Sequence, residues 1–254
     1  HSATAFVGWY NGHPDFRDYP VDLNCKRATI IGMGNVATDI ARILALSPAE
    51  MGKTDLADYA IDALTNSKIE EIEVIARRGP LQAAFTPVGV RKFPDLEDAT
   101  AYVDPSELKL EAVSQKLISD TNDKRILKNL EFLNKIADNR PGDKKKTIRF
   151  VFRRSPLRIV GENGAVKGIE LVQNELFEDE NGVLKIDKQD TCELHETGLV
   201  FNSTGYQVKP IEGVQLDEAK GVIANSEGRL IDPSSKQVIH GRYVVGWAKR
   251  GANG

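Results

Sequence analysis

The hydrophobic pattern of the amino-terminal half alternates between short strand-like runs and stretches with helical spacing. Residues 28–31 are an apolar run of strand length, and apolar side chains then recur at helical spacing as far as Leu44. A second helix is predicted over 54–65 and a second strand over 72–76. Strands that alternate with helices predict an α/β domain built on a parallel sheet.

The pattern is weaker between residues 84 and 140. The sequence Pro-Ser-Glu at 105–107 is typical of a helix start. A further helix is predicted over 123–137, and its buried face is expected to be Ile126, Leu127, Leu130, Leu133 and Ile136.

From Thr147 onward the apolar residues alternate with a period of two. Strands are predicted at 148–152 and 166–172, and a third follows the turn at 180–182. We interpret these three strands as an antiparallel meander inserted in the α/β domain. An apolar strand then follows at 198–202.

The two ends of the chain are unusual for free termini, which are commonly polar and poorly ordered. Residues 1–24 open with a dense aromatic run. At the other end, the segment from Arg242 is an apolar strand that ends in Gly246-Trp247 and is followed by a basic, glycine-rich tail without a closing helix. We predict that 1–24 contain a linker and an entry strand packed on the domain. The alternative is that these aromatic residues pack on a preceding segment, and we expect the chain to be truncated at both ends.

Composition narrows the function classes. The chain has 254 residues, of which 41% are hydrophobic and 28% charged, as in an ordinary soluble globular protein. A net charge of −3 gives no general attraction to nucleic acid or an anionic membrane, and no apolar run is long enough to span a bilayer. Cys25 and Cys192 are far apart in sequence, which argues against a redox dithiol or a zinc site and fits a reducing compartment.

The joint between the first strand and the first helix carries the chemistry. Gly32, Gly34 and Ala37 match G-x-G-x-x-A, a form of the dinucleotide-binding fingerprint. The first glycine permits the tight turn, the second lets the backbone approach a pyrophosphate, and the small third residue lets the helix lie close to the strand. The free N–H groups at the start of the helix then face the anion.

Two arginines, Arg77 and Arg78, follow the second strand. In proteins that bind NAD this position usually holds an acidic residue that binds the ribose 2′-hydroxyl. A guanidinium instead matches the oxygens of a phosphate two at a time. The pair therefore indicates NADP(H), and the alternative is a solvated basic turn.

Six motifs occur in order along the chain and together resemble one family. They are FVGWYNG at 6–12, GMGNVA at 32–37, RRGP at 77–80, AFT at 84–86, RSP at 154–156 and GWAKRG at 246–251. The sequence resembles the adrenodoxin-reductase-like ferredoxin–NADP⁺ reductases. This resemblance implies a flavoprotein with two Rossmann-like dinucleotide-binding domains, one for FAD and one for NADP(H).

The resemblance also implies a division of the chain. Residues 1–204 are expected to be the NADP(H)-binding Rossmann-like domain, with its parallel sheet and inserted antiparallel meander. Residues 205–254 are expected to be part of the carboxy-terminal segment of the FAD domain. We expect the chain alone to be inactive and not to retain FAD.

The resemblance assigns roles to single residues. Gly34, Asn35 and Val36, with Gly32, are implied to form the pyrophosphate loop, and Arg77 and Arg78 the clamp for the 2′-phosphate. Trp247 and Gly254 are implied to lie near the flavin. Arg91 and Arg125 correspond to positions that dock an acidic ferredoxin, although solvated helix charges are an equal alternative.

The sequence departs from the family pattern at one position. The family usually has a glutamate that contacts NADP three residues after the threonine of AFT, and this chain has Gly89 there. The departure is expected to weaken NADP binding modestly, and the alternative is that a backbone N–H or a water substitutes for the contact.

The implied reaction passes a hydride between NADP(H) and FAD, and single electrons between FAD and a ferredoxin-type iron–sulfur protein. Because the flavin carries the chemistry, no acid or base side chain is required. A flavin-independent dehydrogenase is disfavoured, since no tyrosine lies four residues before a lysine. The remaining alternative is the NADPH-binding domain of an oxidoreductase like the small subunit of glutamate synthase. The cytoplasm, or the mitochondrial matrix in a eukaryote, is the expected compartment.

Overall fold

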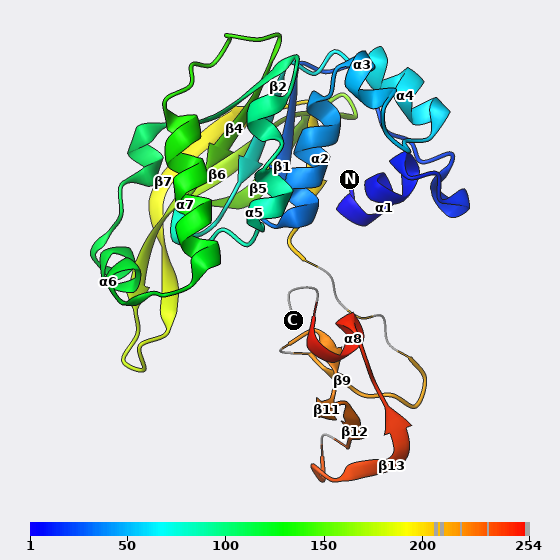
Figure 1. Ribbon diagram of the computed structural model, residues 1–254, viewed down its shortest axis with the longest axis vertical. Coiled ribbons are helices and arrows are strands. Elements are labelled where there is room, and N and C mark those ends of the chain that lie inside the picture. Colours follow the sequence, from blue (N-terminus) through cyan, green and yellow to red (C-terminus); the bar gives the residue numbers. More distant parts are fainter. Residues whose placement is uncertain (206–207, 209–210, 219, 233, 252–254) are drawn as a thin grey trace. The chain divides into compact units, whose positions relative to one another are not determined.

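The computed structural model describes residues 1–205, 208, 211–218, 220–232 and 234–251. The chain divides into two compact units, 1–204 and 205–254, and each is described by itself (Figure 1). The helices of the larger unit are α1 (Ala3–Tyr10), α2 (Asn35–Ala45), α3 (Pro48–Met51), α4 (Asp58–Thr65), α5 (Pro87–Val90), α6 (Ala112–Asp120) and α7 (Lys124–Ala137). Its strands are β1 (Arg27–Ile31), β2 (Glu71–Ile75), β3 (Ala99–Val103), β4 (Lys146–Val151), β5 (Arg154–Glu162), β6 (Ala165–Glu178), β7 (Leu184–Glu196) and β8 (Leu199–Asn202).

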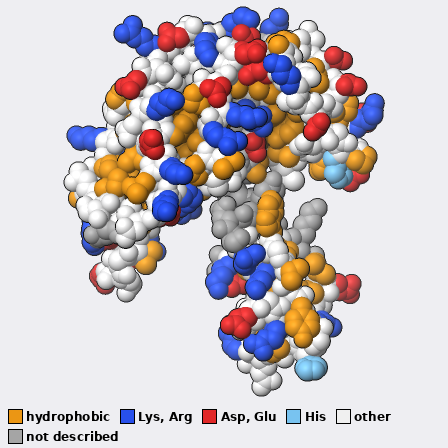
Figure 2. Space-filling model, viewed as in Figure 1, with side chains coloured by type: hydrophobic (Ala, Val, Ile, Leu, Met, Phe, Trp, Pro, Cys, Tyr) orange, Lys and Arg blue, Asp and Glu red, His pale blue; other side chains and the backbone are white. Residues whose placement is uncertain are grey.

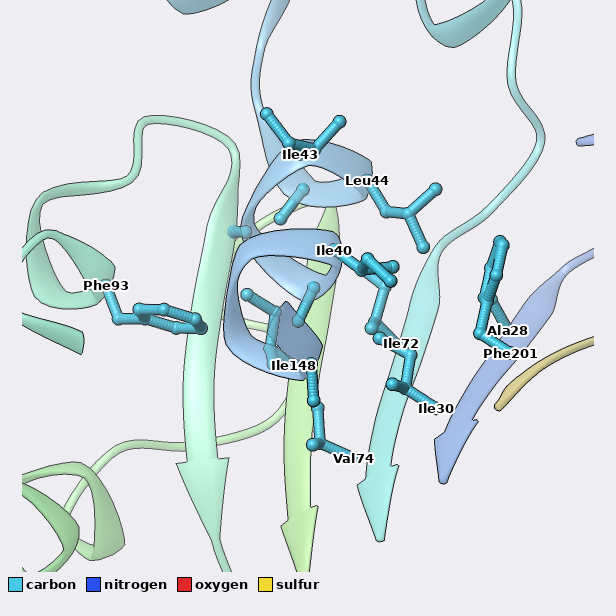
Figure 3. Packing of buried hydrophobic residues seen from close by; sticks show 14 of the residues in the cluster. Ala28, Ile30, Ile40, Ile43, Leu44, Ile72, Val74, Phe93, Ile148 and Phe201 are labelled. Atoms are coloured by element: carbon cyan, nitrogen blue, oxygen red, sulfur yellow. The ribbon is translucent and has the colours of Figure 1, made fainter. Parts of the chain in front are cut away.

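A five-stranded parallel sheet organises the larger unit. Its strand order is β3-β4-β2-β1-β8, and every pairing in it is parallel. Helix α2 lies across one face, where Ile30, Ile72 and Ile148 point toward Ile40 (Figure 3). All four of these side chains are fully buried. This face is therefore the main hydrophobic core of the unit.

A three-stranded antiparallel meander, β5-β6-β7, covers part of the other face of the sheet. Ile31, Ile75 and Val151, at the carboxyl ends of their strands, pack against Ile169 and Leu171 of β6. The α/β fold class with a parallel sheet and an inserted meander is therefore confirmed. The assignment of 148–152 to the meander is wrong, because β4 pairs in parallel with both β2 and β3.

The beginning of the chain is helical, so the predicted entry strand in 1–24 is wrong. Ala3, Phe6 and Tyr10 are all buried at helical spacing. The ring of Phe6 stacks on Trp9 with centroids 5.3 Å apart, and it contacts Phe201 of β8 at 4.6 Å. This packing outweighs the strand propensity of the aromatic residues.

Two boundaries in the middle of the unit differ from the expectations, and one helix matches its prediction except at Leu127. The predicted helix start at 105–107 is only a single 3₁₀ turn, Pro105–Leu108. The helix predicted over 54–65 begins at Asp58 and follows the short α3. Helix α7 matches its prediction and buries Leu133 and Ile136, but Leu127 is 44% exposed because it faces away from the sheet.

The smaller unit is built from short strands and one helical turn. Its elements are β9 (Leu216–Asp217), β10 (Val222–Ile223), β11 (Asn225–Ser226), β12 (Arg229–Ile231), β13 (Val238–Tyr243) and α8 (Trp247–Arg250). Its buried cluster is Ile223, Leu230 and Val244. None of the helices in the described ranges combines the length and the apolar character that a membrane crossing requires.

Candidate dinucleotide site

The turn between β1 and α2 has the backbone that a close-approach loop needs. Gly32 has a φ of 127°, and a Cβ placed on it would lie 2.0 Å from the carbonyl oxygen of Ser203. Gly34 is the N-cap of α2, and no side chain of the described residues caps the helix there. Apart from its two chain neighbours, none of the described residues has an atom within 4 Å of the position that a Cβ on Gly34 would take. The start of α2 therefore presents uncapped N–H groups beside open space.

The segment 84–89 is hydrogen-bonded to this loop. The N–H groups of Ala84 and Phe85 donate to the carbonyl oxygen of Met33 at 2.9 and 3.0 Å. The Oδ1 of Asn35 accepts hydrogen bonds from the backbone N–H and the hydroxyl of Thr86, at 2.8 and 3.1 Å. Because that oxygen is occupied, the Asn35 amide is held in one orientation, and its Nδ2 has no hydrogen-bond partner among the described residues.

Gly89 leaves little room for a side chain. A Cβ on it would lie 3.1 Å from Oδ1 of Asn35 and 3.5 Å from the hydroxyl of Thr86. Its own N–H donates to the carbonyl and hydroxyl oxygens of Thr86, at 2.9 and 3.3 Å. The Gly89 N–H is therefore engaged in capping α5, which removes it as a replacement for the glutamate contact.

The structure brings the arginine pair to the same edge of the sheet as the glycine loop. The N–H of Gly32 donates to the carbonyl oxygen of Ile75, the last residue of β2, at 2.9 Å. Arg77 and Arg78 follow after Ala76 and are exposed. Within the described ranges, neither guanidinium has a hydrogen bond or an ion pair. The geometry therefore places two available cations beside the end of β1.

The two arginines expected to dock a partner differ in their surroundings. Arg91 follows α5 and is exposed. Arg125 lies in the first turn of α7, where its Nη1 donates to the carbonyl oxygen of Ala83 at 2.9 Å and its Nη2 pairs with Asp123 at 3.5 Å. Arg125 therefore has a local structural role. On the face shown in Figure 2, basic and acidic side chains are interspersed over the larger unit.

The expected flavin contacts belong to the smaller unit. Trp247 begins α8 and is 63% exposed, and it follows Gly246, whose φ is 62°. The strand expected to reach it ends earlier, at Tyr243. Gly254 lies outside the described residues.

A charged network that the sequence patterns do not indicate joins the meander to the sheet. Glu73 of β2 is only 4% exposed, and its Oε2 lies 2.9 Å from Nδ1 of His195 in β7. The other ring nitrogen of His195 lies 3.3 Å from Glu193, which pairs with Arg154 at 3.4 Å. The hydrogen bond that Nδ1 of His195 donates to the Glu73 carboxylate, opposed by burial, raises the pKa of His195. Over the described residues there is no cluster of side chains suited to a metal ion.

Known proteins resemble the chain along its whole length. It is 38% identical over 264 residues to a probable ferredoxin/ferredoxin–NADP reductase of Mycobacterium tuberculosis, with all of this chain and 41% of that protein covered. It is 38% identical to the NADPH-ferredoxin reductase FprA of the same organism, of which it covers 53%. To the mitochondrial NADPH:adrenodoxin oxidoreductase of Salvelinus fontinalis it is 36% identical, with 51% of that protein covered. No family model matches.

A solved structure agrees with these relatives. The structure of Mycobacterium tuberculosis FprA in complex with NADPH superposes with a TM-score of 0.85 at 37% identity, covering 98% of this chain and 53% of that one. The resemblance to the ferredoxin–NADP reductases is confirmed. The chain spans about half the length of the curated reductases that it matches. The roles of single residues stay predictions.

Proposed function

We propose that this chain supplies the NADP(H) site of a ferredoxin–NADP⁺ reductase. The observation that carries the proposal is the position of the Gly32–Gly34 loop beside the exposed pair Arg77 and Arg78 at one edge of the sheet. The named relatives, which include an NADPH-ferredoxin reductase solved with NADPH, support the same ligand. The alternative, a glutamate-synthase-like oxidoreductase, is not favoured by these relatives.

The described residues fit the dinucleotide. The open space at Gly34 admits a pyrophosphate, and the uncapped N–H groups at the start of α2 provide donors for its oxygens. The two hydrogen bonds that Thr86 donates to Oδ1 of Asn35 fix the orientation of the amide, so that its Nδ2 is available as a further donor. The Val36 N–H belongs to the same first turn of α2. Arg77 and Arg78 bind the 2′-phosphate that distinguishes NADP(H) from NAD(H).

In the full-length protein we propose a bound FAD, which supplies the hydride and single-electron chemistry. Trp247 and Gly254 are proposed to lie near it. The chain's own contribution is to hold the dinucleotide at the loop and to select it through its 2′-phosphate. The cytoplasm, or the mitochondrial matrix, stays the expected compartment.

The proposed electron partner is a ferredoxin-type iron–sulfur protein, as the names of the relatives suggest. Arg91 is the better docking candidate of the two predicted arginines, since its side chain is exposed and has no hydrogen bond or ion pair within the described ranges. Arg125 is engaged by Ala83 and Asp123.

The test is a titration of the purified chain with NADP⁺ and with NAD⁺ by calorimetry. We expect tighter binding of NADP⁺, and we expect the double variant Arg77→Ala with Arg78→Ala to abolish that preference. The loss of two charge-assisted contacts predicts a fall of at least about tenfold in NADP⁺ affinity. Equal affinity of the native chain for the two nucleotides would refute the clamp.

The control removes the same charge elsewhere. Lys128 and Arg140 are exposed and lie outside the loop and the turn. The double variant Lys128→Ala with Arg140→Ala should bind NADP⁺ as the native chain does at physiological salt. A similar fall in NADP⁺ affinity in both double variants would mean that net charge, rather than a 2′-phosphate clamp, causes the effect.

A further inference from the structure

The backbone of the turn at Arg77 and Arg78, here called the arginine turn, is connected to Arg153 and Asn174 by a ring of three hydrogen bonds. Nδ2 of Asn174 donates to the carbonyl oxygen of Arg77 at 2.7 Å. The N–H of Arg153 donates to the carbonyl oxygen of Arg78 at 3.0 Å, and the N–H of Asn174 donates to the carbonyl oxygen of Arg153 at 2.8 Å. Asn174 therefore supports both arginines, one directly and one through Arg153.

Asn174 is a buried polar residue of the meander strand β6. It is 1% exposed, and its Nδ2 also donates to the hydroxyl of Ser155 at 2.9 Å. Its Oδ1 is buried without a hydrogen-bond partner among the described residues, so the amide is held through Nδ2 alone, which is costly to leave unpaired. The turn itself lies close to the same strand, because a Cβ on Gly79 would come within 3.4 Å of Leu176.

Arg153 is equally fixed. Its backbone has a φ of 54°, in the left-handed region. Its guanidinium donates to the carbonyl oxygens of Glu107 and Lys109 at 2.8 and 3.1 Å, and it pairs with the carboxylates of Glu107 and Glu111, each at 3.7 Å. Its side chain is therefore committed to the fold, unlike those of Arg77 and Arg78.

We propose that Asn174 is a positioning residue for recognition of the 2′-phosphate. It fixes the carbonyl oxygen of Arg77, and through Arg153 that of Arg78, so that both Cα–Cβ bonds leave the turn in set directions. Recognition of a phosphate by a guanidinium fork depends on direction, because paired N–H groups must meet paired oxygens. This inference rests on the function proposed above.

A positioning role and a purely structural role of Asn174 predict different effects on the binding of the two nucleotides. NAD⁺ has no 2′-phosphate, and its pyrophosphate is bound at Gly34 and α2. Loosening the arginine turn should therefore weaken NADP⁺ binding and leave NAD⁺ binding unchanged. General damage to the domain should weaken both nucleotides together.

The experiment measures both dissociation constants, by calorimetry, for the chain and for Asn174→Ala. A second variant, Asn174→Leu, keeps the volume of the side chain and removes the donor, so it avoids a cavity. We expect the ratio of NADP⁺ to NAD⁺ affinity to fall about three- to tenfold in both variants, because the side-chain hydrogen bond to the carbonyl oxygen of Arg77 is lost while the backbone hydrogen bond to Arg153 remains. The matched control is Asn139→Ala, whose Nδ2 donates to the carbonyl oxygen of Ala101 at 2.8 Å, away from the turn. It should keep the native ratio.

The outcomes separate the two proposals. A native ratio in a folded Asn174 variant would overturn the positioning role, even if Arg77→Ala with Arg78→Ala abolishes the preference. Parallel weakening of NADP⁺ and NAD⁺ would also overturn it. A native chain without NADP⁺ preference would instead overturn the function proposed above. If Asn174→Ala does not fold, Asn174→Leu decides.

Discussion

Gly32 and Gly34 lie two residues apart but should respond to alanine in opposite ways. Apart from its chain neighbours, alanine at position 34 meets no atom of the described residues within 4 Å, and the φ of −104° there is open to any residue. Alanine at position 32 must adopt a φ of 127° and places its Cβ 2.0 Å from the carbonyl oxygen of Ser203. That carbonyl has little freedom, because the Ser203 N–H donates to the carbonyl oxygen of Ile31 at 2.8 Å.

The magnitudes follow from these environments. For Gly34→Ala, the weaker N-cap and the reduced freedom of the unfolded chain act in opposite directions. The free energy of unfolding should therefore change by less than about 1 kcal/mol. For Gly32→Ala the backbone alone costs about 1–3 kcal/mol, and the overlap with Ser203 adds to it. The effect on nucleotide binding should be larger than the effect on stability for Gly34→Ala. This variant should keep its fold and lose at least about tenfold in nucleotide affinity, or about 1.4 kcal/mol, because the new methyl group occupies the place of the pyrophosphate.

The assay pairs urea denaturation with calorimetric titration of NADP⁺ and NAD⁺. Since both nucleotides carry the pyrophosphate, Gly34→Ala should weaken both by a similar factor, in contrast to the arginine variants. Native affinity for both nucleotides in Gly34→Ala would refute the placement of the pyrophosphate at this loop. Native stability in Gly32→Ala would refute the steric reasoning for the turn.

Two further predictions concern stability. The pKa of His195 is raised in the folded state, so its pairing with Glu73 stabilises the fold fully below about pH 6.5, the ordinary histidine value, and this contribution is lost as the pH rises through the raised pKa. Denaturation of the chain and of His195→Gln across pH 5–9 should show a difference that shrinks as pH rises, and a constant difference would contradict the pairing. On α7, Leu133→Ala should lower the free energy of unfolding by about 2–5 kcal/mol and Leu127→Ala by less than about 1 kcal/mol, since the former is fully buried and the latter 44% exposed. Equal losses in urea denaturation would contradict that difference.

The parts of the site that could be predicted are those whose signal is local in sequence. The loop at Gly32 lies between a strand and a helix whose patterns are unambiguous, so strand, turn and helix could be assigned together. Arg77 and Arg78 follow the second apolar strand within a few residues, so their position is also visible in the sequence. Neither inference needs contacts between distant segments.

The wrong assignment of 148–152 has a physical cause. In a parallel strand covered on both faces the sequence reads as a continuous apolar run. Arg149 of β4 is instead exposed, because the meander covers only the carboxyl-terminal part of that face of the sheet. An uncovered position in a central strand therefore produces the alternation expected of an antiparallel strand.

Asn174 could not be found from the pattern for a related reason. Along β6 the buried residues are Gly168, Ile169, Leu171, Val172, Asn174 and Leu176, so beyond Leu171 the buried positions are the even-numbered ones. The register shift against β7, between Val172 and Asn174, lies at the same place in the strand. Extending the alternation from 166–172 would have pointed Asn174 toward solvent.

The meander therefore has two separate connections to the sheet, and they differ in kind. Near the carboxyl ends of the strands, Ile169 and Leu171 pack on apolar side chains, and Asn174 reaches the arginine turn beyond them. In the middle of β2, His195 approaches the buried carboxylate of Glu73. Apolar contacts tolerate sliding, whereas the buried pair is directional and fixes the register of the meander on the sheet. A fixed register is what allows one amide on β6 to meet one carbonyl oxygen after β2.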